Sequence, residues 1–243
     1  MNKKDVCIAT LTWARDAVEE TTLRRSLQAL AAIDAPVFIT DGGSGASFLH
    51  FLRSFPQFVL LDGAIRGVWP QAKNSLLHAF RHSAPFLFYT EPDKLHFFEN
   101  GFETMLEQAT ANSQTGVVMA SRSVAGFASF PPFQQMTETT INACCAEVMG
   151  QPADYTYGPF LVNRKLIPYL MQVQEDTGWG WRPYVFGLAH RLGYTVEAFT
   201  ADFFCPPDQQ EDHPKERLYR MRQLSQNLQG LVLSTTAPLG DGF

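Results

Sequence analysis

The N-terminal half of the chain alternates short apolar runs with longer amphipathic segments, and this alternation restricts the fold more than any other feature. The apolar runs, which predict strands, occupy residues 6–11, 37–40, 58–61 and 86–89. Between them, apolar residues recur at every third or fourth position, as on the buried face of a helix. One such stripe consists of Leu23, Leu27, Leu30 and Ile33. Because strands that alternate with helices form a helix-covered parallel sheet, we predict an α/β fold with a mostly parallel, Rossmann-like sheet here.

The second half follows a less regular pattern. Further helices are predicted at about 102–109, 141–149, 166–173 and 214–231, and further strands at 117–120, 160–162 and 195–199. Residues 127–133 include Pro131 and Pro132, which cannot donate hydrogen bonds to a sheet, so this segment is predicted to be a loop. The 243 residues contain no internal repeat and are sufficient for one large α/β domain.

Composition excludes some classes of protein. A formal net charge of -5 argues against a general nucleic-acid-binding protein, which needs a basic face for the phosphate backbone. The four cysteines have neither zinc-site nor disulfide spacing, which favours a reducing compartment. The first residues lack the pattern of a signal peptide, and no apolar stretch reaches the roughly 20 residues of a membrane-spanning helix. We therefore expect a cytoplasmic protein without a transmembrane segment.

The predicted strand at 86–89 leads directly into two carboxylates, Glu91 and Asp93, on either side of Pro92. In an extended chain, side chains at positions i and i+2 point the same way, so these acids can converge on one point. Two like charges this close repel unless a cation lies between them. A hard divalent cation such as Mg²⁺ or Mn²⁺ suits such oxygen ligands. The alternative is a solvated turn in which Lys94 neutralises one acid.

Polar residues follow each predicted strand of the N-terminal half. In an open parallel sheet, the ligand crevice lies outside the carboxyl ends of the strands. The residues at those ends are Thr12, Trp13, Arg15, Asp41, Asp62, Glu91 and Asp93. We therefore expect polar groups from separate strands to meet at one edge of the sheet and to form a ligand site there.

Four segments, taken in order and at about the right spacing, resemble family 2 type glycosyltransferases with the GT-A fold. Residues 8–15 (Ile-Ala-Thr-Leu-Thr-Trp-Ala-Arg) resemble the opening strand and turn of that family, with Trp and Ala in place of its Tyr and Asn. Residues 37–44 resemble its second strand, and residues 71–74 (Gln-Ala-Lys-Asn) resemble a helix start. Residues 91–93 (Glu-Pro-Asp) stand where the family carries its Asp-x-Asp metal motif.

The resemblance implies a single GT-A-like domain over 1–243, with a nucleotide-binding half (1–95) and an irregular acceptor-binding half that ends in a helix (96–243). It also implies transfer of a sugar from a nucleoside diphosphate sugar to a hydroxyl group, with Mn²⁺ or Mg²⁺ as cofactor. The implied metal ligands are Glu91, Asp93 and, from the polar loop before the last helix, His213. The implied nucleotide-binding residues are Thr12, Trp13, Arg15, Asp41, Lys73 and Asn74.

Structural roles stay open for several of these residues. Asp41 precedes two glycines and is also typical of a turn-forming residue. Trp13 is equally consistent with a half-buried core position. His213 is consistent with a surface residue at a helix N-cap.

A second constellation, residues 175–183, resembles the acceptor segment of the same fold through its Gly-Trp-Gly sequence. Trp179 and Trp181 are candidates for acceptor binding, because aromatic faces stack on sugars and glycines allow close approach. Core packing is the alternative for both. Arg182 and Pro183 occupy positions at which inverting enzymes of this fold carry a catalytic carboxylate. Either Asp176 or Glu175 is then the base, or the enzyme retains the configuration of the sugar and needs no base at this position. Arg182 could instead bind an acidic acceptor or the diphosphate.

The main hypothesis is therefore a metal-dependent glycosyltransferase of the hexosyltransferase type, with a small-molecule, glycan or lipid acceptor. The donor sugar, the base and the oligomeric state are left open. One alternative is a nucleotidyltransferase of similar fold, although 12–16 is not the glycine-rich basic loop that such enzymes use. Another is a non-catalytic protein that binds a sugar nucleotide or a glycan. The glycines at 42–45 lack the spacing of a dinucleotide-binding fingerprint.

Overall fold

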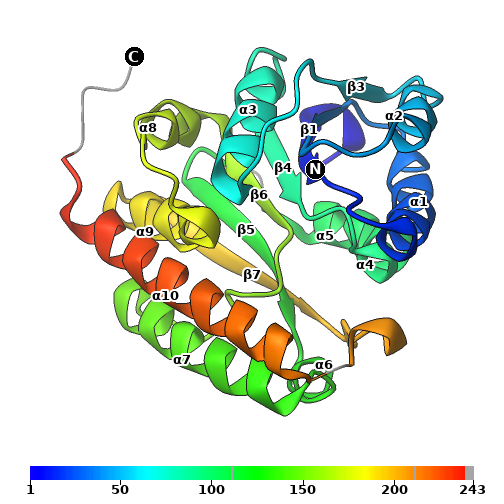
Figure 1. Ribbon diagram of the computed structural model, residues 1–243. Helices are drawn as coiled ribbons and strands as arrows, with labels where there is room; N and C mark the ends of the chain where they lie inside the picture. Colours follow the sequence, from blue (N-terminus) through cyan, green and yellow to red (C-terminus); the bar gives the residue numbers. More distant parts are fainter. Residues whose placement is uncertain (111, 211, 239–243) are drawn as a thin grey trace. The chain divides into compact units, whose positions relative to one another are not determined.

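The computed structural model describes residues 1–110, 112–210 and 212–238 (Figure 1). The chain packs as two compact units. The first comprises Met1–Ala111 and Pro159–Asp176, and the second comprises Asn112–Gly158 and Thr177–Phe243. The first unit contains the predicted nucleotide-binding half together with a later segment of the chain. The prediction of one domain over 1–243 stays a prediction.

The first unit is built on a mostly parallel sheet. Its strands are β1 (Val6–Thr12), β2 (Val37–Asp41), β3 (Phe58–Leu60), β4 (Phe86–Thr90) and β6 (Phe160–Asn163). They are hydrogen-bonded in the order β3-β2-β1-β4-β6, and β6 runs antiparallel to β4 while the other pairs are parallel. β1 and β4 are buried along almost their whole length, as expected for central strands covered on both faces.

Helices surround this sheet within the first unit (Figure 1). They are α1 (Ala17–Ala31), α2 (Ala46–Arg53), α3 (Val68–Phe80), α4 (Leu95–Asn100), α5 (Phe102–Gln108) and α8 (Ile167–Met171), with the 3₁₀ turns η1 (Lys3–Asp5) and η2 (Arg164–Leu166). Asp16 caps α1, since its carboxylate accepts hydrogen bonds from the amides of Val18 and Glu19. The stripe predicted from Leu23, Leu27, Leu30 and Ile33 is buried, but α1 ends at Ala31, so Ile33 lies beyond the helix.

The second unit holds the parallel pair β5 (Thr115–Arg122) and β7 (Thr195–Ala201). Its helices are α6 (Val124–Ala128), α7 (Pro132–Met149), α9 (Trp181–Arg191) and α10 (Pro214–Thr236), with the turns η3 (Gly178–Gly180) and η4 (Pro207–Gln209). α10 packs against both α7 and α9, as Figure 1 also shows. α7 ends at Gly150, whose left-handed φ of 73° suits a residue without a side chain.

The loop predicted at 127–133 is wrong in part. The short helix α6 extends into this segment, and α7 begins within it at Pro132. Pro132 stands in the first turn of α7, where the backbone N–H has no partner inside a helix in any case. The two prolines exclude a strand, as expected, but they are compatible with a helix start.

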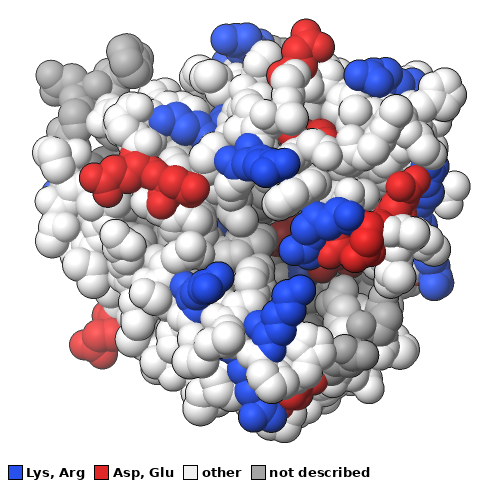
Figure 2. Space-filling model, viewed as in Figure 1, with Lys and Arg blue, Asp and Glu red and all other residues white. Residues whose placement is uncertain are grey.

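The other predicted helices and strands are present, although several bounds differ: α3 begins at Val68 rather than at 71, and the helix predicted at 141–149 is the second half of α7. The chain therefore has the expected α/β architecture. Among the described residues, no helix combines the length and the apolar character that crossing a membrane requires. On the face drawn in Figure 2, basic side chains lie among acidic and uncharged ones.

Candidate active site

The carboxyl ends of the central strands meet at one edge of the sheet in the first unit. In the parallel register, Thr12 at the end of β1 pairs with Asp41 at the end of β2. On the other side of β1, Thr10 pairs with Thr90, the last residue of β4. Glu91 follows Thr90 directly, so the polar strand ends converge as the sequence predicts.

Asp41 is the centre of a closed hydrogen-bond network at this edge. Its Oδ1 accepts hydrogen bonds from the amides of Gly43 (2.8 Å) and Ser44 (2.6 Å). Its Oδ2 accepts from the hydroxyls of Thr12 (2.9 Å) and Ser44 (2.7 Å). Asp41 is 4% exposed. Of the two roles that the sequence allows for Asp41, these contacts correspond to the turn-forming one.

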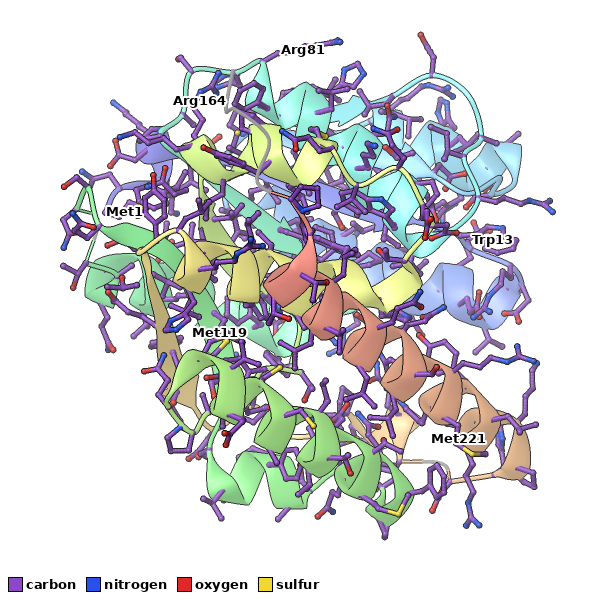
Figure 3. All side chains as sticks on the ribbon, turned by 90° about the vertical axis from the view of Figure 1, so that its left-hand side faces the viewer. Met1, Trp13, Arg81, Met119, Arg164 and Met221 are labelled. Carbon is purple, nitrogen blue, oxygen red and sulfur yellow. The ribbon has the colours of Figure 1, made fainter. Side chains whose placement is uncertain are left out.

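Trp13 lies just beyond β1 and is 37% exposed (labelled in Figure 3). A Cβ atom at Gly42 would lie 2.9 Å from Cβ and Cγ of Trp13, so the absence of a side chain at Gly42 lets the tryptophan pack over the turn. The guanidinium groups of Arg66 and Arg15 lie 5.3 Å and 5.9 Å from the indole centroid. Arg15 also binds Glu19 through Nε at 2.9 Å and through Nη2. An exposed indole between cationic side chains is suited to a flat, anionic ligand.

Glu91 and Asp93 lie in the turn that follows β4. Glu91 is buried, at 6% exposure, whereas the side chain of Asp93 is 33% exposed. Lys94 Nζ lies 3.5 Å from Oδ1 of Asp93, so the ion pair expected for a solvated turn is present. One carboxylate is thus sheltered and the other reaches solvent beside a lysine.

The two acids provide oxygen donors, which is the donor chemistry that Mg²⁺ or Mn²⁺ prefers. In residues 1–110, 112–210 and 212–238, no group of three or more His, Cys, Asp and Glu side chains is close enough to hold a metal. A cation at Glu91 and Asp93 would complete its coordination with water and ligand phosphate, as Mg²⁺ commonly does. The residues therefore fit a divalent cation that binds together with a phosphorylated ligand.

Lys73 and Asn74, two predicted nucleotide-binding residues, make contacts inside the first unit. Lys73 Nζ donates to the carbonyl oxygen of Val173 at 2.7 Å, and burial lowers the pKa of its amine. Asn74 Nδ2 donates to Oγ1 of Thr40 at 3.1 Å. Gln71, which sequence reasoning missed, donates to the carbonyl oxygens of Thr12 and Thr40. Side chains of α3 thus tie β1 and β2 together where these strands end.

Asp176, the candidate base, is exposed near the end of the first unit. It lies beside the loop that precedes α3, because a Cβ atom at Gly67 would be 2.9 Å from its Oδ2. Gly67 has a φ of 104°, which L side chains rarely adopt. Asp176 therefore lies next to Gly67, the residue that follows Arg66.

In the second unit, the glycines of Gly-Trp-Gly serve helix packing. A Cβ atom at Gly178 would clash with the side chain of Gln226, and one at Gly180 would lie 3.0 Å from the backbone carbon of that residue. On α10, a Cβ atom at Gly230 would lie 2.7 Å from Cα of Gly180. The expected close approach occurs, but the partner is the backbone of α10.

The aromatic and basic residues of this segment are largely inside the second unit. Trp181 is 0% exposed and therefore occupies a core position, which was the alternative to acceptor binding. Trp179 is half-buried, its amide donates to Oε1 of Gln226 at 3.2 Å, and its indole lies 5.0 Å from the guanidinium of Arg182. Arg182 is 3% exposed. Of the two tryptophans, Trp179 is the one with surface to offer an acceptor.

His213 is exposed and forms the N-cap of α10. Its Nδ1 accepts a hydrogen bond from the amide of Glu216 at 3.3 Å. Binding of a metal through Nε2 would place the ring proton on Nδ1, which could then no longer accept from the amide of Glu216. Ligation by His213 would therefore require the ring to give up the cap.

Sequence reasoning also missed a buried ion cluster in the second unit. Arg122 donates to Asp154 through Nε at 2.6 Å and to Glu138 through Nη2 at 2.6 Å. Rings of Phe127 and Phe130 lie 4.7 Å and 4.3 Å from its guanidinium. The three charged side chains come from separate elements, so no local spacing in the sequence could have signalled the cluster.

No family model matches the sequence, and no curated protein matches it either. Solved structures do match the fold. Glucosyl-3-phosphoglycerate synthase from Mycobacterium tuberculosis, in complex with Mn²⁺, UDP and phosphoglyceric acid, has a TM-score of 0.63 and 13% identity over 96% of this chain and 79% of that chain. A complex of the same synthase with Mn²⁺, UDP-glucose and phosphoglyceric acid has a TM-score of 0.65 and 13% identity over 96% and 80%.

Mannosyl-3-phosphoglycerate synthase from Rubrobacter xylanophilus has a TM-score of 0.64 and 11% identity, over 97% of this chain and 77% of that chain. Similarity at 11–13% identity establishes a shared fold. The GT-A-type α/β fold that the sequence predicts is thereby confirmed.

Proposed function

We propose that the chain is a metal-dependent glycosyltransferase of the hexosyltransferase type, which moves a sugar from a nucleoside diphosphate sugar to a hydroxyl group of an acceptor. The observation that carries the proposal is the acid pair Glu91 and Asp93 directly after β4, at the same sheet edge as the exposed indole of Trp13. Oxygen ligands and an aromatic surface at one sheet edge are what a metal-bound diphosphate and its nucleobase require.

The solved structures of the same fold support this choice of donor and cofactor. The synthase from M. tuberculosis was solved with Mn²⁺ or Mg²⁺, with UDP-glucose and with phosphoglyceric acid. For this chain we carry over the class of donor and the divalent metal. The acceptor is proposed only as a small molecule, glycan or lipid with a reactive hydroxyl group.

Each residue at the edge has a proposed role. Glu91 and Asp93 hold the metal, which when bound supplies Lewis-acid stabilisation of the diphosphate leaving group. Trp13 binds the nucleobase, and Arg66 offsets phosphate charge. Thr12 and Asp41 hold the turn that carries Trp13, and Lys73 and Asn74 support the edge from α3. Arg15 contributes through its contacts with Trp13 and Glu19.

On the acceptor side, Asp176 is proposed as the base that removes the proton of the acceptor hydroxyl, because it is exposed and carries a carboxylate. Trp179 is proposed to contact the acceptor. Acceptor binding by Trp181, metal ligation by His213 and acceptor or phosphate binding by Arg182 stay predictions from the sequence resemblance. A cytoplasmic location is proposed as well, because the spacing of the four cysteines is typical of neither a zinc site nor a disulfide framework.

A second candidate is a sugar-nucleotide-binding protein without turnover. It is favoured by the burial of Arg182 and Pro183, which stand where inverting enzymes of this fold have their base. The two candidates share the donor site and differ in the fate of the donor.

Incubation of the protein with a panel of nucleoside diphosphate sugars and Mn²⁺ separates them. The proposed transferase releases nucleoside diphosphate, slowly to water when the acceptor is missing. Binding of a donor by calorimetry without release, even with a panel of hydroxylated acceptors, would support the binding protein. Neither binding nor release with any donor would contradict both.

A further inference from the structure

We propose that the donor site accepts nucleoside diphosphates with little regard to the base, because Asp41 is a positioning residue and Trp13 supplies a surface that any base can stack on. This inference rests on the proposed function. It concerns the range of donors, which neither the fold nor the acid pair determines.

The carboxylate of Asp41 is fully hydrogen-bonded within the protein. An ionised carboxylate offers about four acceptor positions, two on each oxygen. All four are used within the protein, by the amides of Gly43 and Ser44 and by the hydroxyls of Thr12 and Ser44, at distances of 2.6–2.9 Å. With 4% of its surface exposed, Asp41 has no position from which to accept a hydrogen bond from a base edge. An edge contact is what distinguishes one base from another.

The hydrogen bonds of Asp41 also fix the backbone around Trp13. The hydroxyl of Ser44, which donates to Asp41, also accepts a hydrogen bond from the amide of Ala14 at 2.8 Å. Thr12 donates to Asp41 from the other side of Trp13. The backbone on both sides of Trp13 is therefore anchored to Asp41, directly or through Ser44. Asp41 acts on a ligand through the orientation of the indole.

The indole of Trp13 is the surface that this edge offers to a base. The indole is 37% exposed and packs over Gly42, and the guanidinium of Arg66 lies 5.3 Å from its centroid. Stacking of a base on an aromatic side chain is worth about 1–3 kcal/mol and tolerates any base, because every base has a π-face. The guanidinium of Arg66 lies over the indole, so a base that stacks on this face takes its place, and the displaced cation suits a phosphate of any nucleotide.

Calorimetry with UDP, GDP and ADP in the presence of Mn²⁺ tests the inference on the unmodified protein. We expect the three dissociation constants to agree within about threefold, since stacking energies differ by less than the roughly 1–3 kcal/mol of a full contact. A preference for one base by more than about 30-fold, roughly 2 kcal/mol, would overturn the inference and leave the proposed function standing. Absence of binding for all three would overturn both.

Substitutions at Trp13, Asp41 and Ser44 test which residues make the site tolerant of the base. Trp13→Ala should weaken all three ligands by a common factor of about 5–150, the equivalent of one stacking contact, and Trp13→Phe should restore most of the affinity. Asp41→Asn should weaken all three equally, and Ser44→Ala, a milder lesion of the same turn, should do so to a smaller extent. Glu107→Gln is the control and should leave all three affinities unchanged. Glu107 is an exposed acid on α5, and the carbonyl of its neighbour Leu106 binds the N-terminus, at the amino end of β1. Loss of affinity for a single base in Asp41→Asn would contradict the positioning role.

Discussion

The hydroxyl of Thr12 donates a hydrogen bond to Oδ2 of Asp41 at 2.9 Å, and the two residues are also partners in the register of β1 and β2. The bond is buried, since both residues are at most 4% exposed. It joins the carboxyl ends of two central strands at the point where the chain turns toward Trp13. A polar strand end that binds its neighbour in this way gives the edge a fixed shape before any ligand arrives.

Replacement of Thr12 by Val should lower the free energy of unfolding by about 1–3 kcal/mol, because a buried hydrogen bond to a charged group is lost at nearly constant volume. Thr12→Ser keeps the hydroxyl and is the matched control. Urea unfolding followed by circular dichroism measures both. Equal stability of Thr12→Val and the unmodified protein would mean that the bond does not hold the edge.

Replacement of Gly180 by Ala should destabilise the second unit by at least about 1–3 kcal/mol, since the new Cβ atom would collide with the backbone of α10 at Gln226. Gly45→Ala adds the same methyl group where no atom lies within 4 Å, at a φ of -66° that alanine adopts, and should cost less than about 1 kcal/mol. Thermal unfolding compares the two variants. If they are equally stable, the close packing of η3 on α10 is not required.

The ion cluster around Arg122 predicts a dependence of stability on acid. Burial alone would raise the pKa of Asp154, but the charge of Arg122 and hydrogen bonds from Arg122, Thr156 and Asn142 outweigh it and lower this pKa from 3.8 to about 2. A depressed pKa contributes stability above the unfolded-state pKa, and this stability is lost as the pH falls from about 4 toward about 2. The contribution at neutral pH is about 2 kcal/mol.

Asp154→Asn should therefore be less stable at pH 7 and should lose less stability between pH 4 and about pH 2 than the unmodified protein. Glu147→Gln, an exposed acid on α7, is the control and should leave the pH profile unchanged. Denaturant titrations at a series of pH values give the profile. Parallel profiles for Asp154→Asn and the unmodified protein would show that Asp154 is not the group that titrates.

Much of the first unit could be predicted because its determinants are local. The strand of 86–89, the stripe of Leu23, Leu27 and Leu30, and the turn after Asp41 each follow from a periodicity or a turn preference within a few residues. The convergence of Thr12, Asp41 and Glu91 then follows from the parallel register. The convergence of these residues could therefore be predicted from local patterns together with the parallel arrangement of the strands.

The roles of individual residues were harder to predict, because they depend on partners that are distant in the sequence. Lys73 binds the carbonyl of Val173, and Arg122 binds Asp154 thirty-two positions away. Gly178 and Gly180 looked suited to a sugar and instead accommodate α10. A sequence shows that a glycine permits close approach but does not show what approaches.

The central claim is that Glu91 and Asp93 bind a divalent cation together with a nucleoside diphosphate. Calorimetric titration of UDP into the unmodified protein, with Mn²⁺ and with a chelator, measures the metal dependence of binding, and the same titrations of Asp93→Asn test its origin. We predict metal-dependent binding in the unmodified protein and in the control Glu107→Gln, and a loss of roughly 10–100-fold or more in Asp93→Asn, with no remaining response to Mn²⁺. Asp93→Asn that binds UDP with unchanged affinity and unchanged metal dependence would contradict the claim.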